Sequence, residues 1–407
     1  MSIATALWAP DKRQDWLVIT LVGVGHAGSH FSHLLLPLMF PIFTEVFGLG
    51  YAQLGLCVTT FFVVSGIGQA MSGFLVDRVG AIWVLLCSLI CLVLGCLVAS
   101  FADGLSGLVA AAFLLGLGNC SFHPIDFSIL NQKVSSHRIG YAYSAHGLCG
   151  NLGWAVAPVF MLTIAQTFGW RWSYLAAGLV FGLLLVLLWT YRTELVTPRS
   201  SHHDSNDVQG FEFMMHPTVW WCFAFFVFST VTLSVVQSFG VSILQRMHEV
   251  SLWAANASLT GYMVCAAAGM LLGGIVSTRY ASQSDRVVAS CMFVGALLIA
   301  LCASGWLGAM GSMLALASTG FAIGIGGPSR DLLIRGATPK GSTGRVYGLV
   351  YSGLDVGFAV APVAFGLLMD RGLYAMTLLL AACTLLLSIG FALAVGHFSR
   401  LKANAVG

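Results

Sequence analysis

The sequence predicts an all-α integral membrane protein whose twelve transmembrane helices form two pseudo-symmetric six-helix bundles. Of its 407 residues, 58% are hydrophobic and only 8% are charged, and the mean hydropathy is +0.90. Such a composition excludes a soluble domain. The charged residues gather in short breaks between apolar runs of about 20 residues, the length that crosses ~30 Å of hydrocarbon as a helix. The two halves of the chain also repeat one pattern of glycines, prolines and charges.

The charged and turn-rich breaks separate twelve apolar runs. Their ranges are 16–43, 51–76, 81–101, 105–131, 139–167, 173–191, 217–245, 253–278, 287–304, 311–334, 345–369 and 373–396. The longest break follows the sixth run and is rich in Ser and Asp. It predicts a bundle over 1–191, a cytoplasmic linker over 192–216 and a second bundle over 217–407.

Charge distribution predicts the orientation of the chain. Fourteen of the eighteen Lys and Arg residues lie in breaks on the side that holds the N-terminus. The positive-inside rule therefore predicts that both termini are cytoplasmic, in a bacterial-type inner membrane. The basic residues are scattered and form no patch, which excludes nucleic acid as a partner. All eleven Cys lie within apolar runs, which argues against a disulfide framework.

An internal duplication relates the two halves. Gly73–Gly80 after the second run matches 274–281 after the eighth, at an offset of 201. Pro124 and Pro158 match Pro328 and Pro362, at an offset of 204. Two anchors in the same order with three residues of drift indicate a tandem duplication of six helices, which is typical of transporters.

The loop after the second run resembles the signature of the major facilitator superfamily, and the resemblance covers essentially the whole chain. Its residues are Gly73, Asp77, Arg78 and Gly80, with a weaker copy at 274–281. The resemblance implies the major facilitator fold and a cytoplasmic gate in which Asp77 and Arg78 take part. Ala81 and Ile82 stand where the family usually has two basic residues, so we expect a reduced charge network at this gate.

Within that superfamily, the fourth and fifth runs look like those of the fosmidomycin-resistance branch of proton-driven exporters. The matching residues are Phe122-His123-Pro124, Gly140-x-Ala142-x-Ser144 and Gly150-Asn151-x-Gly153-x-Ala155-x-x-Pro158. The family's acidic residue directly after His-Pro is replaced by Ile125, and Asp126 follows one place later. A shift of one residue turns a side chain by about 100° around a helix.

The first run carries three histidines on one stripe, His26, His30 and His33, at spacings i, i+4 and i+7. They can bind substrate or protons, pack between helices through hydrogen bonds, or hold a metal. The fourth run carries a similar stripe of Asn119, His123 and Asp126. We expect the two stripes to face each other. The alternative for Asp126 is an interfacial ion pair with Lys133 or Arg138, and Pro124 predicts a kink beside it.

The remaining candidates lie in later runs. A carboxylate near mid-membrane, such as Asp355, costs about 2.5 kcal/mol or more and therefore indicates function or a buried ion pair. Arg330 can neutralise Asp355 or Asp126, bind an anionic substrate or close a gate. The other predicted residues of the substrate and proton pathway are His146, Asn151, Gln237, Asp331 and Tyr351.

These residues predict a secondary active transporter that moves a small molecule by alternating access, with proton-coupled export as the primary hypothesis. The alternative is uptake of a metal, a metallophore or an organic anion through the histidine-rich first helix. No Gly-x-x-x-x-Gly-Lys-Ser/Thr run is present, so an ATP-driven pump is excluded. We expect no enzyme activity, no cofactor and no resident metal at a diagnostic spacing. The expected partners are substrate, protons and lipid, and the superfamily resemblance favours a monomer.

Overall fold

A computed structural model gives the fold and describes residues 10–135, 138–197, 215–337 and 343–406. In those ranges all regular elements are helices. Twelve of the helical segments are long and apolar enough to cross a membrane, and they coincide with the twelve apolar runs of the sequence. The predicted all-α membrane fold is confirmed.

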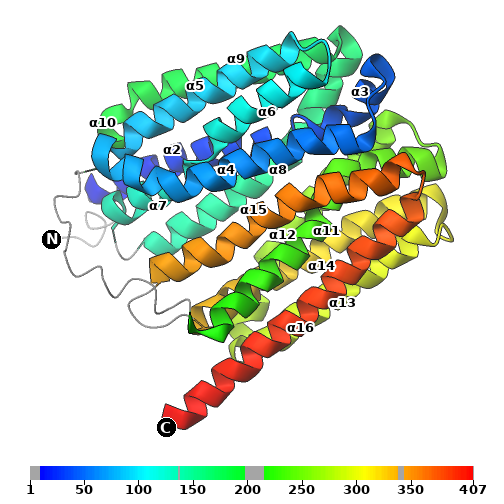
Figure 1. Cartoon of the computed structure of the whole chain (residues 1–407). Helices are drawn as coiled ribbons and strands as arrows, with labels where there is room; N and C mark the ends of the chain where they lie inside the picture. The colour runs from blue at the N-terminus through cyan, green and yellow to red at the C-terminus, as the bar shows by residue number, and fades with distance from the viewer. Residues whose placement is uncertain (1–9, 136–137, 198–214, 338–342, 407) are drawn as a thin grey trace, which may run out of the picture. The chain divides into compact units, whose positions relative to one another are not determined.

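Contacts divide the chain into two compact units, and unit 1 comprises Met1–Leu36 and Val63–His203. In unit 1, α2 packs against α8, while α5 packs against both α6 and α9 (Figure 1). Its helices are α2 (Pro10–His33), the C-terminal part of α4 (Tyr51–Val79), α5 (Ala81–Ser100), α6 (Leu105–Asn119), α7 (Phe122–Lys133), α8 (Ile139–Phe168), α9 (Trp170–Thr190) and α10 (Arg192–Leu195).

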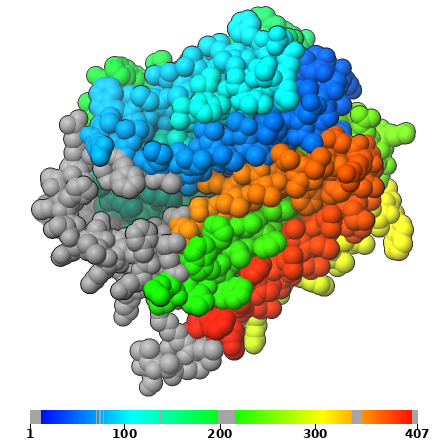
Figure 2. Space-filling model, in the orientation of Figure 1, coloured from blue at the N-terminus to red at the C-terminus, as the bar shows by residue number. Residues whose placement is uncertain are grey.

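Unit 2 comprises Pro37–Phe62 and Asp204–Gly407. In Figure 2, α11 (green) lies between α15 (orange) and α16 (red), and it contacts both. The elements of unit 2 are η1 (Pro37–Met39), α3 (Phe40–Phe47), the N-terminal part of α4, α11 (Pro217–His248), α12 (Leu252–Arg279), η4 (Ala281–Gln283), α13 (Ser284–Ala303), α14 (Gly308–Ala337), α15 (Thr343–Asp370) and α16 (Tyr374–Val406).

Glycines allow close packing inside unit 2. A Cβ at Gly320 of α14 would lie 2.1 Å from the carbonyl oxygen of Tyr262 in α12. A Cβ at Gly324 would lie 2.2 Å from that of Ala266. Small residues let two membrane helices approach until their backbones touch. The repeated glycines of α14 therefore fix its position against α12.

Residues 37–62 belong to unit 2 because their side chains pack against α15. The Thr59 hydroxyl donates to the carbonyl oxygen of Ala359 at 2.5 Å, and the Phe62 ring stacks on Phe358 at 4.3 Å between centroids. The first two spans thus contribute to both units. The predicted linker falls mostly in 198–214, outside the described residues, so the domain boundaries stay predictions.

Two of the predicted runs are interrupted, because the first forms α2, η1 and α3 and the fourth forms α6 and α7. In the first span α2 ends at His33 and η1 begins at Pro37, and the Tyr174 hydroxyl donates to the Leu35 carbonyl between them at 2.8 Å. That hydrogen bond satisfies the Leu35 carbonyl, which lipid tails could not do because they have no hydrogen-bond donors. In the fourth span α6 ends at Asn119, just before the predicted kink, and Pro124 is the third residue of α7. A helix leaves its first amides without internal acceptors, so Pro124 costs little there.

Candidate functional site

The histidines of α2 gather where a glycine face of α8 packs against them. A Cβ at Gly150 would lie 2.8 Å from Nδ1 of His30 and 3.1 Å from Cδ2 of His26. One turn along, a Cβ at Gly153 would lie 2.1 Å from the carbonyl oxygen of Ala27. The missing side chains make room for two imidazoles, whose centroids lie 4.5 Å apart.

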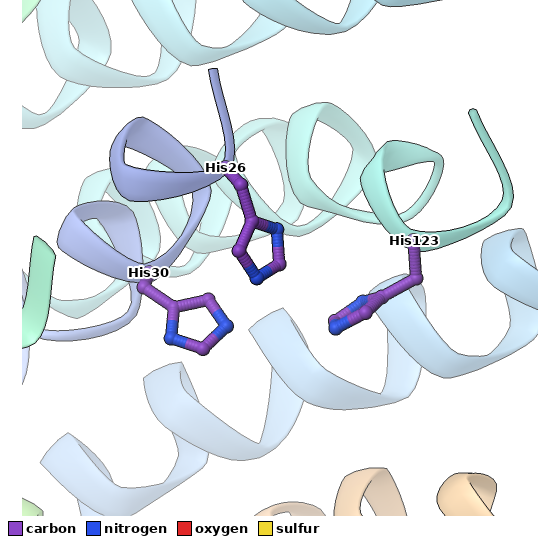
Figure 3. Close-up of side chains that lie close together, drawn as sticks. All are labelled: His26, His30 and His123. Carbon is purple, nitrogen blue, oxygen red and sulfur yellow. The ribbon is translucent and has the colours of Figure 1, made fainter. Parts of the chain in front are cut away.

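Helix α7 adds a third imidazole to this group. The centroid of His123 lies 5.2 Å from that of His26 and 6.2 Å from that of His30. Figure 3 shows the three rings turned toward one another, two from α2 and one from the start of α7. Because the fourth span is interrupted before Phe122, the start of α7 can present His123 to α2.

Asp126 is held between two of the histidines and is only 1% exposed. Nε2 of His146 lies 3.1 Å from Oδ2 of Asp126, within hydrogen-bond distance. Nδ1 of His26 lies 3.0 Å from the same oxygen, at ion-pair distance, and the two rings stack at 3.5 Å. Burying a carboxylate is costly unless donors surround it. The His146 imidazole supplies one such donor, while Nδ1 of His26 lies close to the carboxylate without a hydrogen bond among the described residues.

Asn119 connects the third histidine of α2 to a separate network. Ser29 donates to Oδ1 of Asn119 at 2.5 Å, and Nε2 of His33 lies 3.2 Å from the same oxygen. The Asn119 amide donates to Ser65 at 2.9 Å. The indole of Trp154 donates to Nδ1 of His33 at 3.3 Å. His33 thus has hydrogen bonds at both ring nitrogens.

The predicted stripes of the first and fourth spans do contact each other. The alternative prediction of an interfacial ion pair between Asp126 and Arg138 is wrong. Nη1 of Arg138 pairs instead with Oδ2 of Asp15 at 2.5 Å. Neither this ion pair nor the serines that contact Asn119 can be predicted from local patterns, because the partners lie 54 to 123 residues apart. Asn151 donates to the Gly147 carbonyl of its own helix at 3.0 Å.

Unit 2 places a guanidinium and a carboxylate together. Nε of Arg330 donates to Oδ1 of Asp331 at 2.9 Å, and the Tyr351 hydroxyl donates to the same oxygen at 3.2 Å. The Arg330 guanidinium lies 5.1 Å above the Phe226 ring, a cation–π contact that no sequence pattern predicts. Arg330 and Asp331 thus form an adjacent ion pair between α14, α15 and α11.

Two further predicted residues lie in the same helices. Asp355 follows Tyr351 by four positions and therefore shares its face of α15. Gln237 is buried in α11, and its Nε2 has no hydrogen-bond partner among the described residues. A buried amide with a spare donor can serve a ligand.

The predicted cytoplasmic gate is only partly described. Arg78 lies in the last turn of α4 and is exposed. Gly80 has a φ of +98°, which favours glycine where α5 begins. Gly73 lies within α4, and the side chain of Asp77 lies outside what the structure describes. The gate role stays a prediction.

In the part of the chain that the structure describes, two sets of three side chains have one potential metal ligand each within 4.8 Å of the others. They are His26, His30 and His123, and His26, Asp126 and His146. The sequence offers His26, His30 and His33 as candidate metal ligands. In the structure the third imidazole beside His26 and His30 is that of His123, not that of His33. The second set is already joined through the carboxylate of Asp126.

Comparison with known proteins supports a transporter. The model of the Major Facilitator Superfamily matches residues 22–362. Among curated proteins, an uncharacterized MFS-type transporter, YfnC of Bacillus subtilis, is 28% identical over 181 residues, 44% of each chain. The fosmidomycin resistance protein of Escherichia coli is 25% identical over 175 residues, 42% of this chain and 43% of that protein. The matches thus span less than half the length of these relatives.

Solved structures share the fold across the whole chain. A bacterial homologue of the human lysosomal transporter Spinster, in an inward-facing and occupied conformation, superposes with a TM-score of 0.69 at 15% identity, covering 98% of both chains. The nucleoside transporter NupG gives a TM-score of 0.72 at 13% identity, covering 95% of this chain and 99% of that one. At these identities the likeness concerns the fold alone.

Proposed function

The chain belongs to the major facilitator superfamily, and from this premise we propose that it exports a small molecule in exchange for protons. Transport would proceed by alternating access of two six-helix halves, 1–191 and 217–407. Similarity to the fosmidomycin resistance protein supports the export direction. The positive-inside distribution of Lys and Arg supports an inner-membrane location with both termini in the cytoplasm. The superfamily premise favours a monomer.

The polar face shared by α14 and α15 is the observation that carries proton coupling. Asp355 is the thirteenth of the 28 residues of α15, far from either end of an apolar helix. Tyr351, one turn earlier on the same face, donates to Asp331, which pairs with Arg330. Adding or removing a proton at Asp355 changes the net charge of this face by one. A substrate that binds there then competes with the proton.

Asp355→Asn tests the coupling. Ligands are first found by a thermal-shift screen of organic acids, phosphonates and drugs on the purified protein. Proteoliposomes that contain a pH-sensitive dye then report proton movement when such a ligand is added. We expect wild type to move protons with the ligand and Asp355→Asn to lose at least 90% of that flux, since the amide does not carry a proton.

The matched control is Glu249→Gln, which removes one exposed carboxylate at the end of α11. It should leave coupled flux unchanged. Full proton flux in Asp355→Asn would contradict the assignment. Ligand-driven flux in both variants without any proton movement would contradict proton coupling itself.

A further inference from the structure

The cluster of His26, His30 and His123 has the composition of a metal site. Neutral imidazole nitrogen is the commonest protein ligand for first-row transition metals, and three such ligands leave one position open for water or a second ligand. One nitrogen from each ring lies within 4.8 Å of the other two. Metal–nitrogen bonds of about 2.0–2.1 Å bring ligand nitrogens about 3.4 Å apart. The rings need only a small inward movement to reach that geometry.

Asp126 prepares His26 to act as a ligand. Oδ2 of Asp126 lies 3.0 Å from Nδ1 of His26 but outside hydrogen-bond geometry. The negative charge of the carboxylate still favours the ring proton on that nearer nitrogen. Nε2 of the neutral ring then keeps its lone pair. In Figure 3 the nitrogen of His26 farther from the backbone faces the space between His30 and His123. A carboxylate behind a histidine is a common support of metal ligands, since it fixes the tautomer and the ring orientation.

Burial and charge suit a divalent cation. His26 is 2% exposed, and His30 and His123 are half-buried. Nδ1 of His26, Nδ1 of His30 and Oδ1 of Asp126 are buried without a hydrogen-bond partner among the described residues. Buried polar atoms normally have partners, so unpartnered ones need an explanation. One carboxylate beside the three imidazoles offsets one of the two charges of the ion, which lowers the cost of taking it from water.

We infer that His26, His30 and His123 bind a divalent first-row transition-metal ion, with Asp126 as a positioning residue. Imidazole favours zinc, cobalt, nickel and copper over magnesium and calcium, which prefer oxygen ligands. The bound ion is cargo only if the proposed transport function holds. The site itself does not depend on it.

Binding of Co²⁺ and Zn²⁺ to the purified full-length protein tests the site. Co²⁺ bound by imidazole gives visible absorption bands, and we expect them to saturate at one equivalent and to disappear when Zn²⁺ is added. His30→Ala and His123→Ala should each weaken binding by at least tenfold. Asp126→Asn should weaken it by about 10–100-fold, as expected for a support of a ligand. His248→Ala, at the end of α11, should bind as wild type does, and Mg²⁺ should not compete.

X-ray absorption of the Zn²⁺-loaded wild type provides a test without substitutions. We expect about three imidazole nitrogens near 2.0 Å and no sulfur at 2.3 Å. Absence of stoichiometric binding, a sulfur shell, or binding unchanged in both histidine variants would overturn the site.

Vesicles with an internal zinc dye test whether the bound ion is cargo. Zinc flux that His30→Ala abolishes supports it, and binding without flux overturns it. Loss of proton coupling alone, with binding and flux intact, concerns only the proposed function.

Discussion

The two units carry equivalent prolines but build different helices around them. In unit 1, Pro124 follows an interruption at residues 120–121 and lies in the first turn of α7. In unit 2, its duplicate Pro328 lies inside the continuous α14. Gly320 and Gly324, which precede Pro328, let α14 approach the backbone of α12 closely. A proline inherited by duplication can therefore end up at a helix start or within a helix.

The polar groups near these prolines differ in the same way. The start of α7 presents a half-buried His123 and a buried Asp126 to the imidazoles of α2. In α14, Arg330 and Asp331 pair with each other, and the Asp331 side chain is 47% exposed. One unit thus holds a buried cluster of imidazoles around a carboxylate, while the other holds a partly hydrated ion pair. Duplicated scaffolds can keep their backbone residues and exchange their chemistry.

The largest expected difference concerns the two carboxylates. Asp126→Ala leaves Nε2 of His146 without its acceptor and removes the carboxylate beside His26, and we expect a loss of about 3–5 kcal/mol in the free energy of unfolding. Asp331→Ala should cost less than about 1 kcal/mol, because water replaces a half-exposed partner. Unfolding in mixed micelles measures both. Asp126→Asn, which keeps an acceptor oxygen, should lose less than Asp126→Ala. Equal losses in the two units would refute the contrast.

Two duplicated glycines should give an intermediate effect. A Cβ at Gly153 of α8 would lie 2.1 Å from the Ala27 carbonyl oxygen, and one at Gly357 of α15 would lie 2.8 Å from that of Val227. Overpacking of this kind costs about 1–3 kcal/mol. We expect Gly153→Ala to lower the unfolding temperature more than Gly357→Ala. Gly147→Ala, where a Cβ meets nothing within 4 Å, is the control and should leave that temperature unchanged or raise it.

Two buried serines should give the smallest effect, with opposite signs. Ser29 of unit 1 donates to Asn119, so Ser29→Ala should cost about 1 kcal/mol. Ser329 of unit 2 is 0% exposed and its hydroxyl has no hydrogen-bond partner among the described residues. Ser329→Ala removes an unsatisfied group and should be neutral or stabilising. A clear loss from Ser329→Ala would show that this hydroxyl has a partner in the membrane-embedded protein.

Sequence patterns were enough to predict the twelve spans, because each depends on apolar length alone. The facing stripes of the first and fourth spans also followed from helical periodicity. Helical periodicity did not predict that His123, and not His33, lies beside His26 and His30. That arrangement depends on the orientation of α7 after the interruption between α6 and α7. The partners of Asp126 could not be chosen either, since an ion pair with a nearby Arg and a cluster with distant histidines satisfy the carboxylate equally well. Contacts among distant residues decide such cases, and one sequence does not contain them.

The passage of the chain between units inside the first span has a consequence for its connectivity. The first segment of unit 1 ends at Leu36. Residues 37–62 belong to unit 2, and the second segment of unit 1 begins at Val63. A nick between residues 203 and 204 would therefore produce two fragments that are not the two units. The first fragment would retain residues 37–62, which pack on α15 of the second through Thr59 and Phe62. Because residues 37–62 of the first fragment pack on the second fragment, we expect the two fragments to associate when they are expressed together.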